Sequence, residues 1–220
     1  ARDNFGNTVF HYACKNGCSE TVKLILDFSK ENEAIDLNAR DNLGRTAYHL
    51  ACTFGRTEIV KLILDFSKEN DAIDLNARIN NVGWTPFLSA CREGNTEIVK
   101  LILDFSQEND AIHLITTTGW GMTAFHMTCR RDNPKTVKLF LDFSQESDAI
   151  DLDARFHNGK TAFLQACEKG CSETVKVLLD FSKENEGIDL TATDDSGRTA
   201  FHLACEYGRT EIAKVILDLA

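Results

Sequence analysis

The chain has 220 residues, of which 24 are Lys or Arg and 34 are Asp or Glu, so its formal net charge at pH 7 is −10. This acidic balance argues against a nucleic-acid partner, because nucleic-acid binding depends on basic patches that neutralise phosphates. No apolar run is long enough to cross a membrane, and no signal peptide is recognisable. If the eight cysteines are free thiols, they indicate a reducing, cytoplasmic compartment.

One short phrase, which reads TAFHLAC in its last copy, recurs six times along the chain. A fixed period of this length indicates a stacked array of small units, each of which packs only on its neighbours. We therefore expect a single array, and we interpret it as a piece of a longer protein. The copies begin at Thr8, Thr46, Thr85, Thr123, Thr161 and Thr199, at spacings of 38, 39, 38, 38 and 38 residues. The repeats are 1–38, 39–76, 77–115, 116–153, 154–191 and 192–220.

Each repeat is expected to begin with a turn and a short helix. A sequence such as Asp3–Gly6 is typical of a turn, since Gly reaches positive φ without steric cost. The Thr that follows can cap the free amides at the start of a helix. Nine residues after Thr8, Gly17 ends that first helix, and a second helix begins two residues later at Ser19.

The second helix of each repeat is predicted from apolar residues at a spacing of three and four, such as Ile59, Ile63 and Phe66. We expect this helix to continue to an Asn that adopts the left-handed conformation, because Asn is common where a helix ends in that way. The expected stops are near Asn32, Asn70, Asn109 and Asn185.

Over its whole length the chain resembles the ankyrin repeat family. The resemblance rests on the D-x-x-G turn, the T-x-x-H start of the first helix, the Gly between the helices and the IDLNA phrase. It implies an all-α, elongated and curved solenoid of helix–turn–helix units, with β-turn fingers projecting on one side. The period is about five residues longer than the usual 33. Two repeats also depart by having Leu88 and Leu164 in place of the His.

Cysteine and histidine recur at fixed repeat positions, which indicates structural roles. Equivalent atoms in neighbouring layers should lie about 10 Å apart, too far for a disulfide or a shared metal ion. We therefore expect no metal, no cofactor and no catalytic site, and hence no enzyme. Buried thiols are expected at Cys14, Cys52, Cys91, Cys129, Cys167 and Cys205, and more exposed thiols at Cys18 and Cys171 in the turns between helices. The histidines expected to orient the turns are His11, His49, His126 and His202.

Positions that vary between repeats indicate where a partner binds. In the family that the chain resembles, fingers and the ends of first helices line the concave, binding face. All eleven arginines fall in fingers, at the ends of first helices or in the turns between helices, whereas most acidic residues lie in the second helices and the long loops. Trp and Arg are frequent in binding hot spots. The candidate contact residues are Leu43, Arg45, Phe54, Val82, Trp84, Arg92, Trp120, Met122, Arg130 and Arg131.

These features favour a protein-interaction module that binds, on its finger and first-helix face, a protein or peptide with acidic and apolar residues. One alternative is a structural spacer or elastic scaffold in a longer array, which the near-identity of the LDFSKENDAIDLNAR segments favours. Another is a non-catalytic regulatory part of an enzyme or channel. The tryptophans could also serve only to stiffen the fingers. We expect a monomer that could make end-to-end contacts through its apolar end faces.

The resemblance further implies a modification. Asn38 and Asn76 match the residue that an asparaginyl hydroxylase modifies in ankyrin repeats, while Asp153 and Thr191 occupy that position in later repeats.

Overall fold

The computed structural model describes residues 1–32, 35–79 and 82–218. It divides into two compact units, Ala1–His113 and Leu114–Ala220. Within the described ranges there are twelve α-helices and no strand longer than an isolated bridge, so the prediction of an all-α fold is confirmed. None of the described helices combines the length and apolar character that a membrane span needs.

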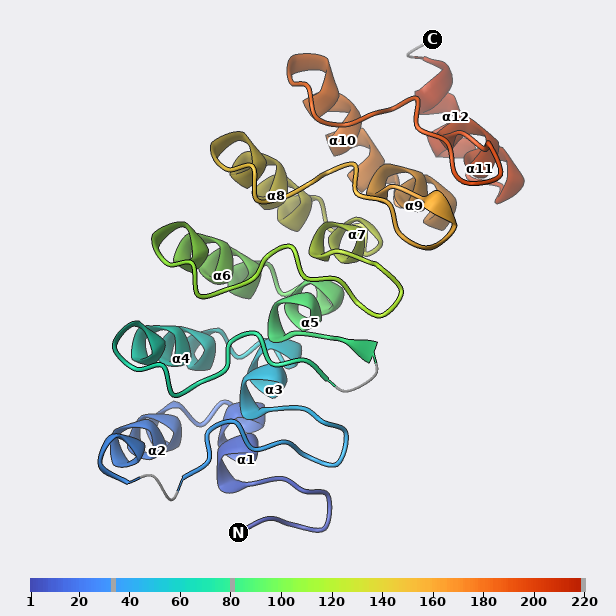
Figure 1. The fold of residues 1–220 in the computed structure, drawn as a ribbon. Coiled ribbons are helices and arrows are strands. Elements are labelled where there is room, and N and C mark those ends of the chain that lie inside the picture. Colours follow the sequence, from blue (N-terminus) through green and yellow to red (C-terminus); the bar gives the residue numbers. More distant parts are fainter. Residues whose placement is uncertain (33–34, 80–81, 219–220) are drawn as a thin grey trace. The chain divides into compact units, whose positions relative to one another are not determined.

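The first unit contains three helix pairs (Figure 1). The first helices α1, α3 and α5 pack in one row, and the second helices α2, α4 and α6 pack in another beside it. Each loop between pairs swings out beyond the row of first helices to form a finger. The helices are α1 Val9–Asn16, α2 Ser19–Glu31, α3 Ala47–Thr53, α4 Thr57–Glu69, α5 Pro86–Glu93 and α6 Thr96–Glu108.

The second unit is built in the same way. First helices α7, α9 and α11 contact one another in sequence, and second helices α8, α10 and α12 do the same. A short 3-10 turn, η2 His157–Gly159, lies in the finger before α9. The helices are α7 Ala124–Cys129, α8 Pro134–Glu146, α9 Ala162–Lys169, α10 Ser172–Glu184, α11 Ala200–Glu206 and α12 Thr210–Leu217.

A reciprocal cap starts the first helix of most repeats. The side chain of Thr8 accepts a hydrogen bond from the N–H of His11, and Nδ1 of His11 accepts one from the N–H of Thr8 at 3.1 Å. Because Nδ1 accepts, Nε2 carries the proton, and it lies 3.0 Å from the carbonyl oxygen of Arg45 in the next finger. The prediction that these histidines orient the turns is therefore confirmed. The same box forms at Thr46, Thr123 and Thr199.

The second helices end where the sequence predicts, but not in the predicted conformation. Their last residues directly precede Asn32, Asn70, Asn109 and Asn185. Each Asn is extended, with φ between −135° and −146°, and is not left-handed. In three of the four the side chain caps the helix instead, since its Nδ2 donates to a Phe carbonyl one turn earlier, as Asn70 does to Phe66 at 3.0 Å.

The cysteines are all free thiols, and most lie in the core. Cys14, Cys52 and the three equivalents that follow them are fully buried, as predicted. The expectation of a buried thiol at Cys205 was wrong, because this side chain in α11 is exposed. The expectation for Cys171 was wrong. It is buried because its thiol lies 3.5 Å from the carbonyl oxygen of Arg130, against the end of α7, whereas Cys18 is exposed as expected.

Candidate functional site

Each finger is a tight turn that presents one side chain at its tip. In the second finger the buried carboxylate of Asp41 accepts hydrogen bonds from the N–H groups of Leu43 and Arg45, both at 2.9 Å. Gly44 has a φ of +79°, a conformation in which a β-carbon is strained, so the turn reverses there. We define the finger-tip position as the residue before this Gly. It is occupied by Phe5, Leu43 and Val82 in the first unit, and by Trp120, Asn158 and Ser196 in the second.

In three repeats the residue after the turn Gly, the finger base, pairs with the first helix of its own repeat. The guanidinium of Arg92 stacks on the ring of Trp84, 4.9 Å from its centroid. At the equivalent positions of the fifth repeat, Lys160 and Glu168 form a buried ion pair. In the sixth repeat, Arg198 binds Glu206 at 2.7 Å. The half-buried Trp84 therefore belongs to a clamp that recurs in three repeats and holds their fingers to their first helices.

The predicted contact residues separate into exposed and buried groups. Trp120 is 59% exposed at the tip of its finger, and Leu43 is similarly exposed at its own. Phe54 is exposed beneath the ammonium group of Lys15, 5.4 Å from its ring centroid, and Val82 is half-buried. Met122 is only 6% exposed, because it is a finger-base residue that lies inside the second unit. The inclusion of Met122 as a contact residue therefore needs correction.

Most arginines on this face are bound to the scaffold. In the finger, Arg45 binds the buried Asp41 at 2.7 Å. Nε of Arg56 donates to the carbonyl oxygen of Lys15 at 2.8 Å, and Arg209 does the same to Glu168 at 3.0 Å. Guanidinium groups at the start of fingers bind the carbonyl one repeat further on, as Arg2, Arg40 and Arg155 do.

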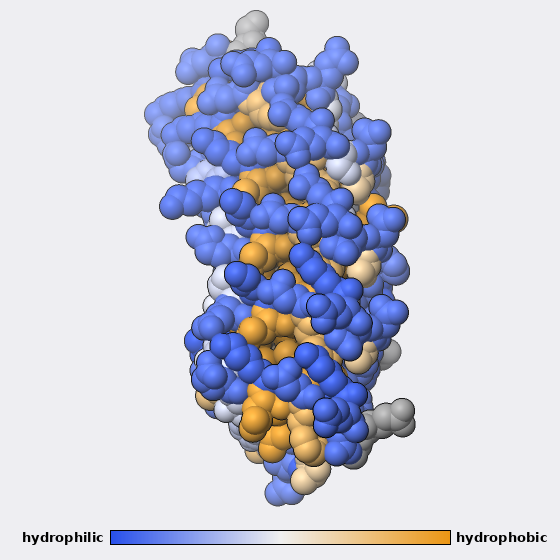
Figure 2. All heavy atoms as spheres, turned by 90° about the vertical axis from the view of Figure 1, so that its left-hand side faces the viewer, coloured by the Kyte–Doolittle hydropathy of each residue, from blue (hydrophilic) through white to orange (hydrophobic). Residues whose placement is uncertain are grey.

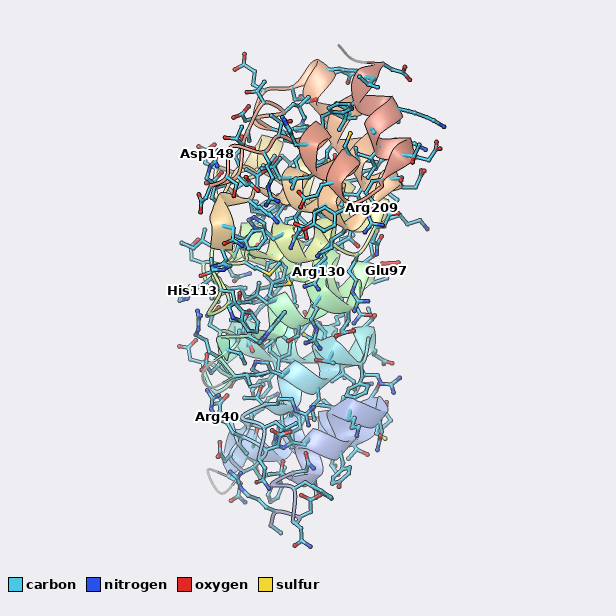
Figure 3. The ribbon with its side chains drawn as sticks, turned by 90° about the vertical axis from the view of Figure 1, so that its right-hand side faces the viewer. Arg40, Glu97, His113, Arg130, Asp148 and Arg209 are labelled. Carbon is cyan, nitrogen blue, oxygen red and sulfur yellow. The ribbon has the colours of Figure 1, made fainter. Side chains whose placement is uncertain are left out.

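Arg130 and Arg131 end the first helix of the fourth repeat, and both are exposed. Figure 3 looks onto the fingers and first helices and labels Arg130 at the end of α7 and Arg209 ahead of α12. Several arginines of the finger face, such as Arg45, Arg56 and Arg209, thus have a structural role.

A groove of about 420 Å³ lies between the first two fingers of the first unit. Its walls carry the exposed side chains of Phe5, Tyr12 and Leu43, with Lys15 and Arg45 at the sides. The hydroxyl of Tyr12 donates to the carboxylate of Asp3 at 2.6 Å, which lowers the pKa of Asp3 and raises that of Tyr12.

Our sequence prediction did not include Phe5 and Tyr12. Phe5 could have been found, because it occupies the same finger-tip position as Leu43 and Trp120. Tyr12 could not, because its repeat position is buried in every other repeat, as at Leu50 and Leu203.

The two asparagines proposed for hydroxylation connect successive loops. Nδ2 of Asn38 donates to the carbonyl oxygen of Ala72 at 2.8 Å, and its Oδ1 accepts from the N–H of Asp74 at 2.7 Å. Asn76 makes the same pair of bonds to Ala111 and His113. Both amides have a structural role, and their hydroxylation stays a prediction.

Among the described residues there is no group of three or more His, Cys, Asp or Glu side chains that could hold a metal ion. Among curated protein sequences none matches this chain.

The family model for ankyrin repeats in three copies matches residues 1–78, 32–112, 68–151, 106–194 and 148–220. A solved structure titled "Crystal Structure of EF0377 an Ankyrin Repeat Protein" matches with a TM-score of 0.75 and 25% sequence identity. That match covers 98% of each chain. Matches of the family model from the first residue to the last, together with the six capped helix pairs, show that this chain belongs to the ankyrin repeat family.

Proposed function

We propose that this chain binds a protein segment on the finger-tip side of its repeats. Ankyrin repeats generally mediate protein–protein interaction, and the family is typically non-enzymatic. The observation that carries the proposal is the groove between the first two fingers, whose walls are exposed apolar side chains. Exposed aromatic residues at a concave surface are typical of binding sites.

The apolar side chains at the finger tips support a binding role, because the turn does not require an apolar residue at that position. Ser196 occupies the same position in the sixth repeat, where Asp194 accepts from its N–H as Asp41 does from the N–H of Leu43. The large side chains of Phe5, Leu43 and Trp120 therefore expose apolar surface to solvent, which a polar residue at the same position would not do.

The chemistry of the groove defines the partner that fits it. Phe5, Tyr12 and Leu43 offer an apolar surface for one large side chain. The ammonium group of Lys15 lies at the side, where it can pair with a carboxylate. We therefore assign the partner as a segment in which an aromatic or large aliphatic residue is flanked by Asp or Glu.

The alternative function, a structural spacer, is supported by the bonds between repeats. Arg40 binds the carbonyl oxygen of Arg78, and Asn38 and Asn76 each connect two loops with near-identical geometry. These bonds explain why the scaffold residues repeat. They do not explain the apolar finger tips, and for that reason we favour the interaction module.

The proposal is tested by selecting peptides from a random displayed library on the folded chain. The decisive variant is Phe5→Ser with Leu43→Ser, because Ser196 is the finger-tip residue of a turn with the same hydrogen bonds as the finger of Leu43. The matched control is Ile115→Ser, which removes a highly exposed apolar side chain that is not at a finger tip. Peptides with an apolar residue beside acidic residues should bind at least about tenfold more weakly to the double variant and equally well to the control. Selected peptides that bind the double variant as tightly as the parent would contradict the proposal.

A further inference from the structure

A second groove, of about 410 Å³, lies between the second helices α8 and α10 of the second unit. Figure 2 looks onto the second helices and shows apolar residues between the charged side chains on that side. The apolar part of the groove lining consists of the buried Leu141 and the half-buried Val177 and Phe181. The groove therefore offers apolar surface on a side of the repeats that is otherwise strongly charged.

In the first unit a lysine covers the surface that corresponds to this groove. The ammonium group of Lys68 in α4 lies over the ring of Phe105 in α6, 5.7 Å from its centroid, and binds the carboxylate of Glu108 at 3.2 Å. Lys30 in α2 lies over Phe66 in α4 in the same way, also at 5.7 Å. Phe66 and Phe105 are only 9% and 5% exposed. The junction between two second helices thus binds an ammonium group twice within this unit.

The junction between α8 and α10 has the same ring and carboxylate but not the lysine. Gln145 in α8 occupies the position of Lys68, and its Nε2 donates to Oδ1 of Asn185 at 2.8 Å. Phe181 and Glu184 in α10 are the equivalents of the ring and the carboxylate that Lys68 contacts. Here Phe181 is half-buried and Glu184 is exposed. The place that an ammonium group takes in the first unit is therefore open in this groove.

The charges around the groove favour a cation at this place. Asp180 binds Lys183 of its own helix at 2.8 Å. The groove lining also includes Lys138, which lies seven residues before Gln145 on α8 and hence about 10 Å away along the helix axis. The end of the groove beside Phe181 is therefore acidic. Three exposed carboxylates line the groove, those of Asp142, Asp180 and Glu184.

We propose that the groove between α8 and α10 binds a basic segment of a partner protein, through a Lys or Arg side chain that lies over Phe181 and pairs with Glu184. This side chain takes the place that Lys68 takes over Phe105 in the first unit. Its apolar stem suits the apolar lining, and its charge is attracted by both the ring and the carboxylate. The site lies on the second helices and selects a basic partner, so it is independent of the groove between the first two fingers and of the function proposed above.

Selection from a random displayed peptide library, in the presence of a competitor, tests this inference. The library is selected on the immobilised chain while an excess of the free variant Gln145→Lys is present. This variant should fold, because the chain itself has Lys68 at the equivalent position, and its own ammonium group should cover Phe181. Peptides that bind surfaces common to both proteins, the groove between the first two fingers included, are held by the competitor and washed away. The peptides that stay on the immobilised chain should contain Lys or Arg.

The affinity of single retained peptides for three variants provides the decisive result, once circular dichroism and melting temperatures have shown that the variants fold. Gln145→Lys and Glu184→Gln should each weaken binding about fivefold or more. Asn16→Lys is the matched control, because it adds the same charge at an exposed position at the end of α1, and it should leave binding unchanged. The inference is overturned if no peptide is retained, or if the retained peptides lack Lys and Arg. Binding that is unaffected by Glu184→Gln, or that is weakened as much by Asn16→Lys as by Gln145→Lys, also overturns it.

Discussion

At the scale of single residues, the repeats place different side chains at equivalent positions, so their contacts can be compared within one chain. Asn38 and Asn76 each donate one hydrogen bond and accept another between successive loops. Asp153 occupies the same position in the fourth repeat, where its carboxylate accepts from the N–H of Asp189. An ionised carboxylate cannot donate the second bond, and burial, followed by the charges of Asp189 and Asp151, raises the pKa of Asp153.

Replacing Asp153 by Asn should therefore stabilise the protein. The new amide can make both bonds, and it removes a half-buried charge, so the free energy of unfolding at pH 7 should rise by about 1 kcal/mol. Urea denaturation of the parent and of Asp153→Asn measures this difference. Asn76→Asp is the matched control, and it should lower stability by a similar amount. A variant Asp153→Asn that is less stable than the parent would show that the two positions are not equivalent.

The buried histidines predict how stability depends on pH. Burial lowers the pKa of His49 and of His126 to about 4, while the unfolded chain titrates near 6.5. The folded protein therefore holds these rings neutral, and its stability is complete above pH 6.5 and is lost as the pH falls towards 4. Each His should account for about 3 kcal/mol over that range.

The test is denaturation at several pH values of the parent and of His49→Leu with His126→Leu. Leu is the residue that this chain has at the equivalent Leu88 and Leu164, so the variant should fold. Its stability should fall less between pH 6.5 and 4 than that of the parent. Parallel curves for the two proteins would refute this account of the histidines.

At the scale of elements, the finger clamp separates the roles of the two tryptophans. Trp84 is a finger-base residue that stacks against Arg92 on α5, and its carbonyl oxygen accepts from His49. Trp120 is a finger-tip residue and is exposed. Both lie in fingers that depart from the repeat sequence, and the sequence alone does not distinguish the position that packs from the position that projects.

The two tryptophans should respond differently to alanine. Trp84→Ala removes the stacked ring and should cost about 1 to 2 kcal/mol of unfolding free energy, whereas Trp120→Ala should change it by less than about 0.5 kcal/mol. Thermal denaturation of each single variant provides the comparison. Equal losses of stability would mean that Trp120 is also part of the scaffold.

Features that recur in every repeat could be predicted from the sequence, whereas contacts that differ between repeats could not. Helix positions, caps and buried thiols were predictable because each repeats with a fixed chemical requirement, as the Thr46–His49 box does. Met122 and Cys171 were misjudged because their burial depends on which neighbouring element approaches them, and that differs between repeats. The groove was missed because it is formed by two fingers 38 residues apart, at Phe5 and Leu43.

At the scale of the whole molecule, the chain combines a uniform scaffold with a variable finger side. Within each unit, arginine side chains such as Arg40 and Arg155 join neighbouring repeats. Finger tips change from apolar in the first four repeats to polar in the last two. A partner segment that binds along the fingers should therefore engage the early repeats.

Hydrogen exchange of the chain with and without a selected peptide tests the central claim most directly. We predict slower exchange in the fingers around Phe5 and Leu43 and at the end of α1, with no change in the second helices α2 and α4. Protection confined to those second helices, with unchanged exchange in the fingers, would contradict the claim that the finger side is the binding surface.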